Sequence, residues 1–193
     1  MGNAMNKQLL GFLCFTAVAL PAFAALEAGD RAPAFEARAS LAGEAFDFSL
    51  SDALAEGNVV VYFFPSAYTR GCNIQAHEFA VNMDAFEAAG ASVIGVSLDS
   101  IERLNDFSAD PDYCAGKLAV ASDPTGAIAR SYELEVRGAR EGAVDTRGVA
   151  IDHGFAERTT FIVTPDGRIA ETIGGISPLE NVQKSLEAVQ RLK

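Results

Sequence analysis

The feature that most constrains the fold is a run of six apolar residues, from Val59 to Phe64, that stops at Pro65. A short run that is apolar at every position and ends at a turn signal is typical of a strand buried on both faces. Such a strand needs one layer above it and one below it. The chain is therefore expected to build its domain around a central sheet that is covered on both sides.

Strands and helices alternate around this run. Apolar residues at Phe79, Met83 and Phe86 follow helical spacing, and the segment Pro165–Gly167 is typical of a hairpin turn. The pattern indicates an α/β layered domain with a mixed sheet. In chain order we predict a hairpin (35–39 and 45–48), the central strand (59–64), a helix (72–89), a strand (93–98), a helix (100–107), a strand (118–121), a helix (125–132), a long irregular crossing (135–157), a hairpin (159–164 and 168–173) and a closing helix (178–192).

The N-terminus has the layout of a secretory signal peptide. Lys7 precedes an apolar stretch of 12 residues at 9–20, and Ala22-Phe23-Ala24 matches a cleavage site. We predict cleavage after Ala24, which leaves 25–193 as one domain that is exported, for example to a periplasm. A retained membrane anchor is the alternative, although spanning a bilayer takes about 20 residues. Residues 1–4 are read as an upstream start or a cloning remnant.

The formal net charge of −11 limits the kinds of partner. Binding to phosphate or anionic lipid needs clustered lysine and arginine, so neither nucleic acid nor a membrane surface is expected as a partner of the mature chain. The acidity by itself is explained by solubility. After cleavage removes Cys14, two cysteines remain, Cys72 and Cys114. In an oxidising compartment they can form one disulfide, either permanent or cycling.

Cys72 follows a predicted strand and loop and stands in the first turn of a predicted helix. Free backbone N–H groups at such a position stabilise a thiolate. Thr69 places a hydroxyl nearby that can accept from the thiol or donate to an incoming oxygen, and Pro65 ends the strand and stiffens the loop. The alternative is an inert, half-buried thiol, because cysteine is often buried.

The pattern Pro65-x-x-x-Thr69-x-x-Cys72, after an apolar strand and before a helix, resembles the peroxidatic motif of the peroxiredoxins of the AhpC/TSA superfamily. The likeness runs from about Ala28 to the C-terminus and is greatest to the Q-type, or bacterioferritin comigratory, branch. It implies a thioredoxin-like fold, with a central mixed sheet flanked by helices and an N-terminal hairpin extension. Arg158, before a later strand, matches the arginine that completes the family's site.

The resemblance implies a thiol peroxidase that reduces hydrogen peroxide and organic hydroperoxides through a sulfenic acid on Cys72. Arg158 is expected to pair with Cys72 and to hold the peroxide oxygens; a surface salt bridge is its alternative role. Two departures from the family stand out. Gln75 replaces the usual glutamate and keeps a hydrogen bond without the charge, and His77 stands where many Q-type members have a second cysteine.

Cys114 is the remaining candidate for that second cysteine. The resemblance implies that it lies in a helical region and resolves the sulfenic acid as an intramolecular disulfide. Because a disulfide needs Cα atoms within about 7 Å, local unwinding around both cysteines is expected. A permanent structural disulfide and an unpaired Cys114, as in a one-Cys peroxiredoxin, stay open as alternatives.

The implied partners are a hydroperoxide substrate and a thioredoxin-like or other dithiol reductant, and the chain is expected to be a monomer or a homodimer. No cofactor and no metal are expected; His77 and His153 have no metal-ligand spacing and are predicted to be surface histidines. Two other functions are weighed. A thiol-disulfide exchanger usually has a second cysteine where Gln75 stands, and a non-catalytic binding module would be held by a Cys72–Cys114 bond.

Overall fold

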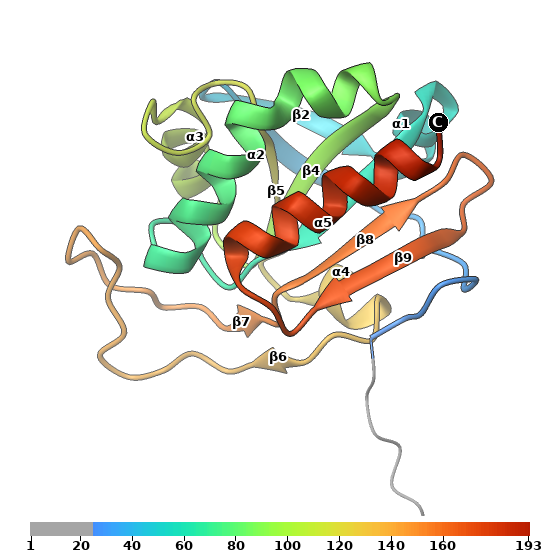
Figure 1. Cartoon of the computed structure of the whole chain (residues 1–193). Coiled ribbons are helices and arrows are strands. Elements are labelled where there is room, and N and C mark those ends of the chain that lie inside the picture. Colours follow the sequence, from blue (N-terminus) through green and yellow to red (C-terminus); the bar gives the residue numbers. More distant parts are fainter. Residues whose placement is uncertain (1–24) are drawn as a thin grey trace, which may run out of the picture.

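The apolar run forms an inner strand, β3, of a seven-stranded sheet. The structure is a computed structural model that describes residues 25–193, so the predicted signal peptide lies outside the described residues. The strand order is β2-β1-β5-β4-β3-β8-β9, and β6 and β7 form a separate ladder (Figure 1). The elements are β1 (Glu36–Leu41), β2 (Glu44–Ser49), α1 (Leu50–Glu56), β3 (Asn58–Phe63), α2 (Arg70–Ala88), β4 (Ala91–Ser97), α3 (Ile101–Ala109), β5 (Ala119–Ser122), α4 (Ala127–Ser131), β6 (Val136–Arg137), β7 (Phe155–Ala156), β8 (Thr159–Val163), β9 (Ile169–Gly174) and α5 (Pro178–Arg191).

Strand β3 contacts both layers that cover the sheet, as its apolar run predicts. Val60 and Tyr62 belong to one apolar cluster, and Val61 and Phe63 belong to the other. None of these four side chains is more than 1% exposed. Each buried apolar side chain of this size stabilises the fold by about 1.5–3 kcal/mol. Packing therefore fixes the position of β3 and of the start of the loop that follows it.

The sheet is mixed, as predicted. β3 pairs in parallel with β4, and β4 pairs in parallel with β5. The late hairpin of β8 and β9 joins β3 in antiparallel fashion, and the N-terminal hairpin of β1 and β2 joins β5 in the same way. Because β3, β4 and β5 are parallel, the loops at their carboxyl ends meet at one edge, which is where open α/β sheets carry their sites.

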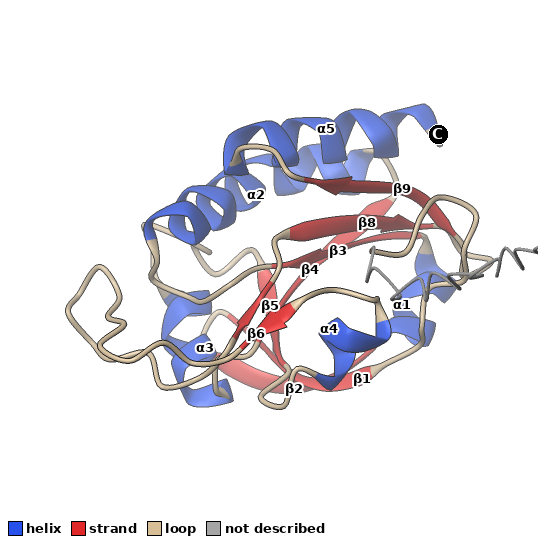
Figure 2. Ribbon diagram, turned by 90° about the horizontal axis from the view of Figure 1, so that it is seen from below, coloured by secondary structure: helices blue, strands red, loops and turns tan. Residues whose placement is uncertain are grey.

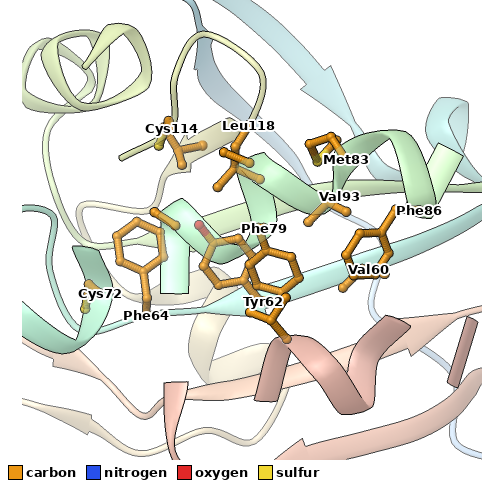
Figure 3. Packing of buried hydrophobic residues seen from close by; sticks show 14 of the residues in the cluster. Val60, Tyr62, Phe64, Cys72, Phe79, Met83, Phe86, Val93, Cys114 and Leu118 are labelled. Carbon is orange, nitrogen blue, oxygen red and sulfur yellow. The ribbon is translucent and has the colours of Figure 1, made fainter. Parts of the chain in front are cut away.

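Helices cover both faces of this sheet. Residues of α2, α3 and α5 share a cluster with Tyr62, whereas α1 and α4 pack on the other face. Figure 2 shows α2 and α5 together on one side and α4 on the other. The ring of Tyr62 stacks on Phe79 of α2, with centroids 4.5 Å apart (Figure 3). Gly95 of β4 pairs with Tyr62 of β3. A Cβ at Gly95 would lie 2.5 Å from the Tyr62 ring, so only glycine fits at this position.

Two helices differ from the sequence prediction. α1 was not predicted, although the hydroxyl of Ser49 caps it by accepting from the amide of Asp52. α2 begins at Arg70 rather than at Cys72, because Thr69 occupies the N-cap. The first helical turn therefore includes the two residues before the cysteine.

Two loop regions differ as well. Cys114 does not lie in a helix: residues 111–117 form consecutive turns that lead into β5. The crossing segment (135–157) is mostly irregular, as predicted, but its two ends pair with each other as β6 and β7. A further bridge joins Val144 to Ala150. The segment thus leaves the ladder and returns to it as a long loop (Figure 1).

Candidate active site

The loop between β3 and α2 holds the cysteine of the motif. Pro65 lies just beyond β3, and Thr69 is the extended N-cap of α2, with φ −92° and ψ 147°. The amide of Asn73 donates to the carbonyl of Thr69 at 2.8 Å. The amides of residues 70–72 precede this bond and have no acceptor within the helix. Cys72 therefore lies at the positive end of α2.

The hydroxyl of Thr69 has a fixed role as a donor. It donates to the carbonyl of Ser66 at 2.9 Å, so its oxygen lone pairs remain as acceptors. Of the two roles that the sequence leaves open for Thr69, accepting a hydrogen bond fits this arrangement. Donating to an incoming oxygen would require the bond to Ser66 to break.

Arg158 lies immediately before β8, the neighbour of β3, and its guanidinium reaches the sulfur. Nη2 donates to Cys72 Sγ over 3.3 Å. Gly71 leaves room for this approach, because a Cβ at that position would lie 3.1 Å from the same nitrogen. Cys72 is only 1% exposed, and Arg158 is half-buried. The structure thus brings together the two residues that the motif comparison singled out.

A buried chain of amides holds Arg158 from behind. Gln75 accepts from Arg158 Nη1 through Oε1 and donates through Nε2 to Asn181 Oδ1 at 2.9 Å. Thr160 donates to the same oxygen at 2.7 Å, and Asn181 Nδ2 donates to the carbonyl of Ile173 at 3.0 Å. Sequence reasoning missed Asn181 and Thr160; the available signal was a polar residue on the apolar face of α5.

Every member of this chain is neutral except Arg158. Among residues 25–193, Arg158 forms no ion pair within 4.0 Å. Gln75 therefore orients the guanidinium without cancelling its charge. The positive charge remains available to the sulfur and to any oxygen anion that forms beside it.

A second network holds the start of the same loop. Asp99, which follows β4 and is fully buried, accepts from the Ser66 hydroxyl at 2.9 Å and from the Ala67 amide at 2.8 Å. His153 Nε2 and Arg103 Nε each lie 2.8 Å from Asp99 Oδ1, the oxygen that also accepts from Ser66. Burial raises the pKa of Asp99, but hydrogen bonds, chiefly from His153, and the charge of His153 outweigh burial and lower it overall.

His153 is not the surface histidine that the sequence predicted. Its side chain is 14% exposed, with Nδ1 2.7 Å from the carbonyl of Gly154 and Nε2 facing Asp99. Both neighbours only accept hydrogen bonds, so the ring fits best as the doubly protonated cation. Burial lowers the pKa of His153, but the bond to Asp99 and the charge of Asp99 raise it overall. His77, in contrast, is exposed as predicted.

The crossing segment also covers the loop. Thr146 donates to the carbonyl of Tyr68 through its amide at 2.9 Å and its hydroxyl at 2.8 Å. The guanidinium of Arg147 lies 3.2 Å from the centre of the Tyr68 ring. Asp145 pairs with both Arg147 and Arg103, and Arg103 also donates to the loop. Tyr68 has a φ of +61°, so these contacts hold a strained backbone in place.

Cys114 has very different surroundings. It is fully buried in the apolar cluster that also contains Cys72 (Figure 3). Burial and, to a lesser degree, the charge of Asp110 raise the pKa of the Cys114 thiol well above its usual range. Both cysteines of the described chain are free thiols. Tyr62 belongs to the same cluster, and its buried hydroxyl has no hydrogen-bond partner among residues 25–193. Burial, and to a lesser degree both cysteines, raise the pKa of Tyr62.

Residues 25–193 contain neither a candidate metal centre nor a candidate membrane-spanning helix. No three His, Cys, Asp or Glu side chains gather there in a way that could hold a metal ion. No helix of that part is long and apolar enough to cross a membrane.

Cys72 lies at the start of a helix that follows an inner strand of a mixed α/β sheet, and it contacts an arginine. This arrangement is typical of a thiol-based redox protein. The chain belongs to the AhpC/TSA family, whose sequence pattern matches residues 28–172. It is thus a peroxiredoxin, a thiol-dependent peroxidase that reduces hydroperoxides.

Relatives agree with this assignment. A Mycobacterium tuberculosis protein named as a peroxiredoxin is 33% identical over 144 residues, which are 75% of this chain and 82% of the relative. A bacterioferritin-comigratory type peroxiredoxin of Helicobacter pylori is 27% identical over 85% of this chain and 98% of its own. The second of these relatives bears the name of the branch that the motif resembles.

Solved structures show the same fold. Peroxidoxin BcpB from Mycobacterium tuberculosis superposes with a TM-score of 0.71 at 24% identity, over 87% of this chain and 99% of that one. A cysteine-to-serine variant of peroxiredoxin Q from Xylella fastidiosa gives 0.70 at 21% identity, over 88% and 98%. The predicted thioredoxin-like fold, with its mixed sheet flanked by helices and its N-terminal hairpin, is confirmed.

Proposed function

We propose that Cys72 is the sulfur that attacks the hydroperoxide and that Arg158 is its main electrostatic partner. The observation that carries this proposal is the 3.3 Å contact between Arg158 Nη2 and Cys72 Sγ at the start of α2. Cys114 is at least as buried, but the charge that acts on it is the acid Asp110, so burial alone does not single out a reactive thiol.

The reaction follows from this geometry. The thiolate of Cys72 attacks one peroxide oxygen; an S–O bond forms, the O–O bond breaks, and the departing oxygen leaves as alkoxide or hydroxide that takes up a proton. Cys72 becomes a sulfenic acid and the peroxide is reduced to alcohol or water. Negative charge moves from sulfur to the leaving oxygen, and Arg158 and the amides of residues 70–72 are the donors available to stabilise it.

Thr69 and Pro65 orient the peroxide and the loop. Because the Thr69 hydroxyl donates its hydrogen bond to the carbonyl of Ser66, its lone pairs can accept a hydrogen bond from the hydroperoxide that Cys72 attacks. That contact would align the O–O bond with the sulfur. Alignment of the reacting atoms is the main way in which positioning raises the rate. Pro65 fixes the backbone between β3 and this loop.

We further propose that Cys114 resolves the sulfenic acid. Its thiol would attack Cys72, forming the S–S bond and releasing water, and a thioredoxin-like or other dithiol would then reduce the disulfide. Both cysteines belong to one cluster and both are free. Cys114 lies in turns rather than in a regular helix, which lowers the cost of the local opening that bond formation requires.

The place of action is proposed from the N-terminal sequence alone. Cleavage after Ala24 would export residues 25–193 as a monomer or homodimer, and the reductant would then be a dithiol of the same compartment. N-terminal sequencing of the exported protein should begin at Ala25, and exported protein that still begins at Met5 would refute cleavage.

Turnover of hydrogen peroxide with a dithiol reductant tests the central assignment. Wild-type protein should consume peroxide, and Cys72→Ser should do so only at the background rate. Cys114→Ser separates the two ways of completing the cycle: a resolving role predicts loss of steady turnover with the first oxidation retained. Equal, slow consumption by wild type and Cys72→Ser would contradict the proposal.

A further inference from the structure

A pocket opens beside the proposed active site, between the β6–β7 ladder and the end of β3. Its volume is about 520 Å³. Pro65 and Arg158 line it, and Arg158 is the residue that also donates to Cys72 Sγ. The full lining is Pro65, Arg137, Gly138, Arg140, Phe155, Ala156, Glu157 and Arg158. Pockets of about 300–1,000 Å³ hold organic ligands, and hydrogen peroxide alone needs far less space.

The charge of this pocket is opposite to that of the chain. The whole chain carries a formal −11. The lining contains three arginines and one glutamate, which gives +2 (three minus one). Positive charge concentrated in a concave site attracts anions and repels cations. A hydroperoxide that bears a negative group would therefore be favoured at this opening over a neutral one of the same shape.

The three arginines are not equally available. Arg158 donates to Cys72 and to Gln75. Arg137 donates to Glu135 at 2.8 Å. Arg140 is exposed and forms no ion pair with any acid of residues 25–193. Arg140 is thus the guanidinium that can bind a ligand's carboxylate without first giving up a partner.

The rest of the lining suits an apolar body. Phe155 is half-buried in β7, and Ala156 and Pro65 add apolar surface next to it. Arg140 lies beyond β6, in the irregular part of the crossing segment, and Arg158 adjoins β8. Both line the pocket together with Phe155, so a ligand that contacts both arginines also meets this apolar surface. A matching ligand would carry a carboxylate, an apolar body and a hydroperoxide.

We propose that the pocket selects hydroperoxides that carry a carboxylate on an apolar body, with Arg140 as the specificity-determining residue and Phe155 as the apolar wall. The inference rests on the proposed function, because Cys72 must be the sulfur that such a ligand meets. Glu157 lines the same pocket and limits the attraction, so the carboxylate is recognised by the direct Arg140 contact rather than by the field alone.

A matched pair of substrates tests the inference. Cumene hydroperoxide and its para-carboxylate analogue share one apolar body and differ in charge, and the measured quantity is the ratio of their kcat/KM values. Arg140→Gln should lower this ratio about tenfold, the loss expected for one charge-assisted contact. Arg38→Gln is the control, because it removes the same charge from the distant β1–β2 hairpin, where Arg38 pairs with Asp47.

The outcomes separate the inference from the proposed function. Three results together support the inference. Arg140→Gln lowers the ratio, Arg38→Gln leaves it unchanged, and raising the salt concentration lowers it in wild type. An unchanged ratio in Arg140→Gln, or an equal loss on both substrates, overturns the inference. The proposed function still holds in that case if the wild-type protein turns over hydrogen peroxide. Phe155→Ala adds a second arm: it should lower kcat/KM for both organic substrates relative to hydrogen peroxide, and no relative loss would contradict the apolar wall.

Discussion

The two cysteines of residues 25–193 lie in one apolar cluster and are equally hidden, at 1% exposure for Cys72 and 0% for Cys114. Their immediate neighbours differ. Cys72 faces the guanidinium of Arg158 at the start of a helix, whereas Cys114 lies in turns near the negative charge of Asp110, and burial and that charge raise its pKa. The contrast teaches that the charges facing a sulfur, and not its depth, decide what it can do.

The same contrast extends to how each neighbourhood is supported. Arg158 is held by the neutral amides of Gln75 and Asn181, which leaves its charge directed at the sulfur. The beginning of the loop is held by Asp99, whose negative charge is compensated by Arg103 and His153. Charge is thus compensated where the loop is anchored and left uncompensated beside Cys72, where the reaction is proposed to occur.

The largest expected effect is a difference in thiol alkylation in the native, reduced protein. Because burial and Asp110 disfavour the Cys114 thiolate, Cys72 should react about a thousandfold faster than Cys114. Mass mapping of the two cysteine peptides after timed alkylation measures both rates. In denaturant the two rates should converge, and similar rates in the native protein would break the comparison.

Removing the cation from Cys72 should have the next largest effect. Arg158→Met deletes the donor at the sulfur and should lower kcat/KM for hydrogen peroxide about a hundredfold, the usual cost of losing one preorganised donor. Arg168→Met, an exposed arginine of the β8–β9 turn, is the matched control. A loss of less than about threefold in Arg158→Met would show that the contact does not assist the reaction.

Removing the support of that cation should have a smaller effect. Gln75→Leu leaves Arg158 without its amide acceptor, so kcat/KM should fall about tenfold while Arg158 itself remains. Gln75→Glu restores an acceptor and should recover part of the rate, which a merely structural role would not predict. Asn82→Leu, on the outer side of the same helix, serves as the control. Equal rates for Gln75→Leu and wild type would contradict the positioning role.

The smallest expected effect is the pH dependence of the loop anchor. The pKa of His153 is raised in the folded protein, so its contribution to stability is complete below its unfolded value of about 6.5 and is lost as pH rises through the folded value. The free energy of unfolding should fall by about 1 kcal/mol more in wild type than in His153→Gln between about pH 6 and pH 9. Urea unfolding measures this, with the exposed His77→Gln as control.

Much of the fold could be predicted because the pattern is local. The run ending at Pro65 predicted β3, and the turn around Gly167 predicted the β8–β9 hairpin. α1 was missed because it is a single short helix of seven residues, and Cys114 was placed in a helix where turns occur. Short elements are decided by tertiary contacts that a sequence window does not contain.

The site could be predicted in part for the same reason. Cys72, Thr69 and Pro65 lie in one short motif, and Arg158 came only from the family resemblance. Asn181 and the partners of His153 were not predicted, because they depend on which distant segments meet. The buried Asn181 in α5 and Asp99, two residues after the end of β4, can be recognised as site residues only once the topology is known.

The measurement that tests the account most directly is the site of first oxidation. Reduced Cys114→Ser protein is treated with one equivalent of hydrogen peroxide, and the cysteine peptide is weighed by mass spectrometry. The account predicts the addition of one oxygen atom on Cys72, and in wild type the loss of two hydrogens as Cys72 and Cys114 join. A Cys72 peptide of unchanged mass after the peroxide has been consumed would contradict it.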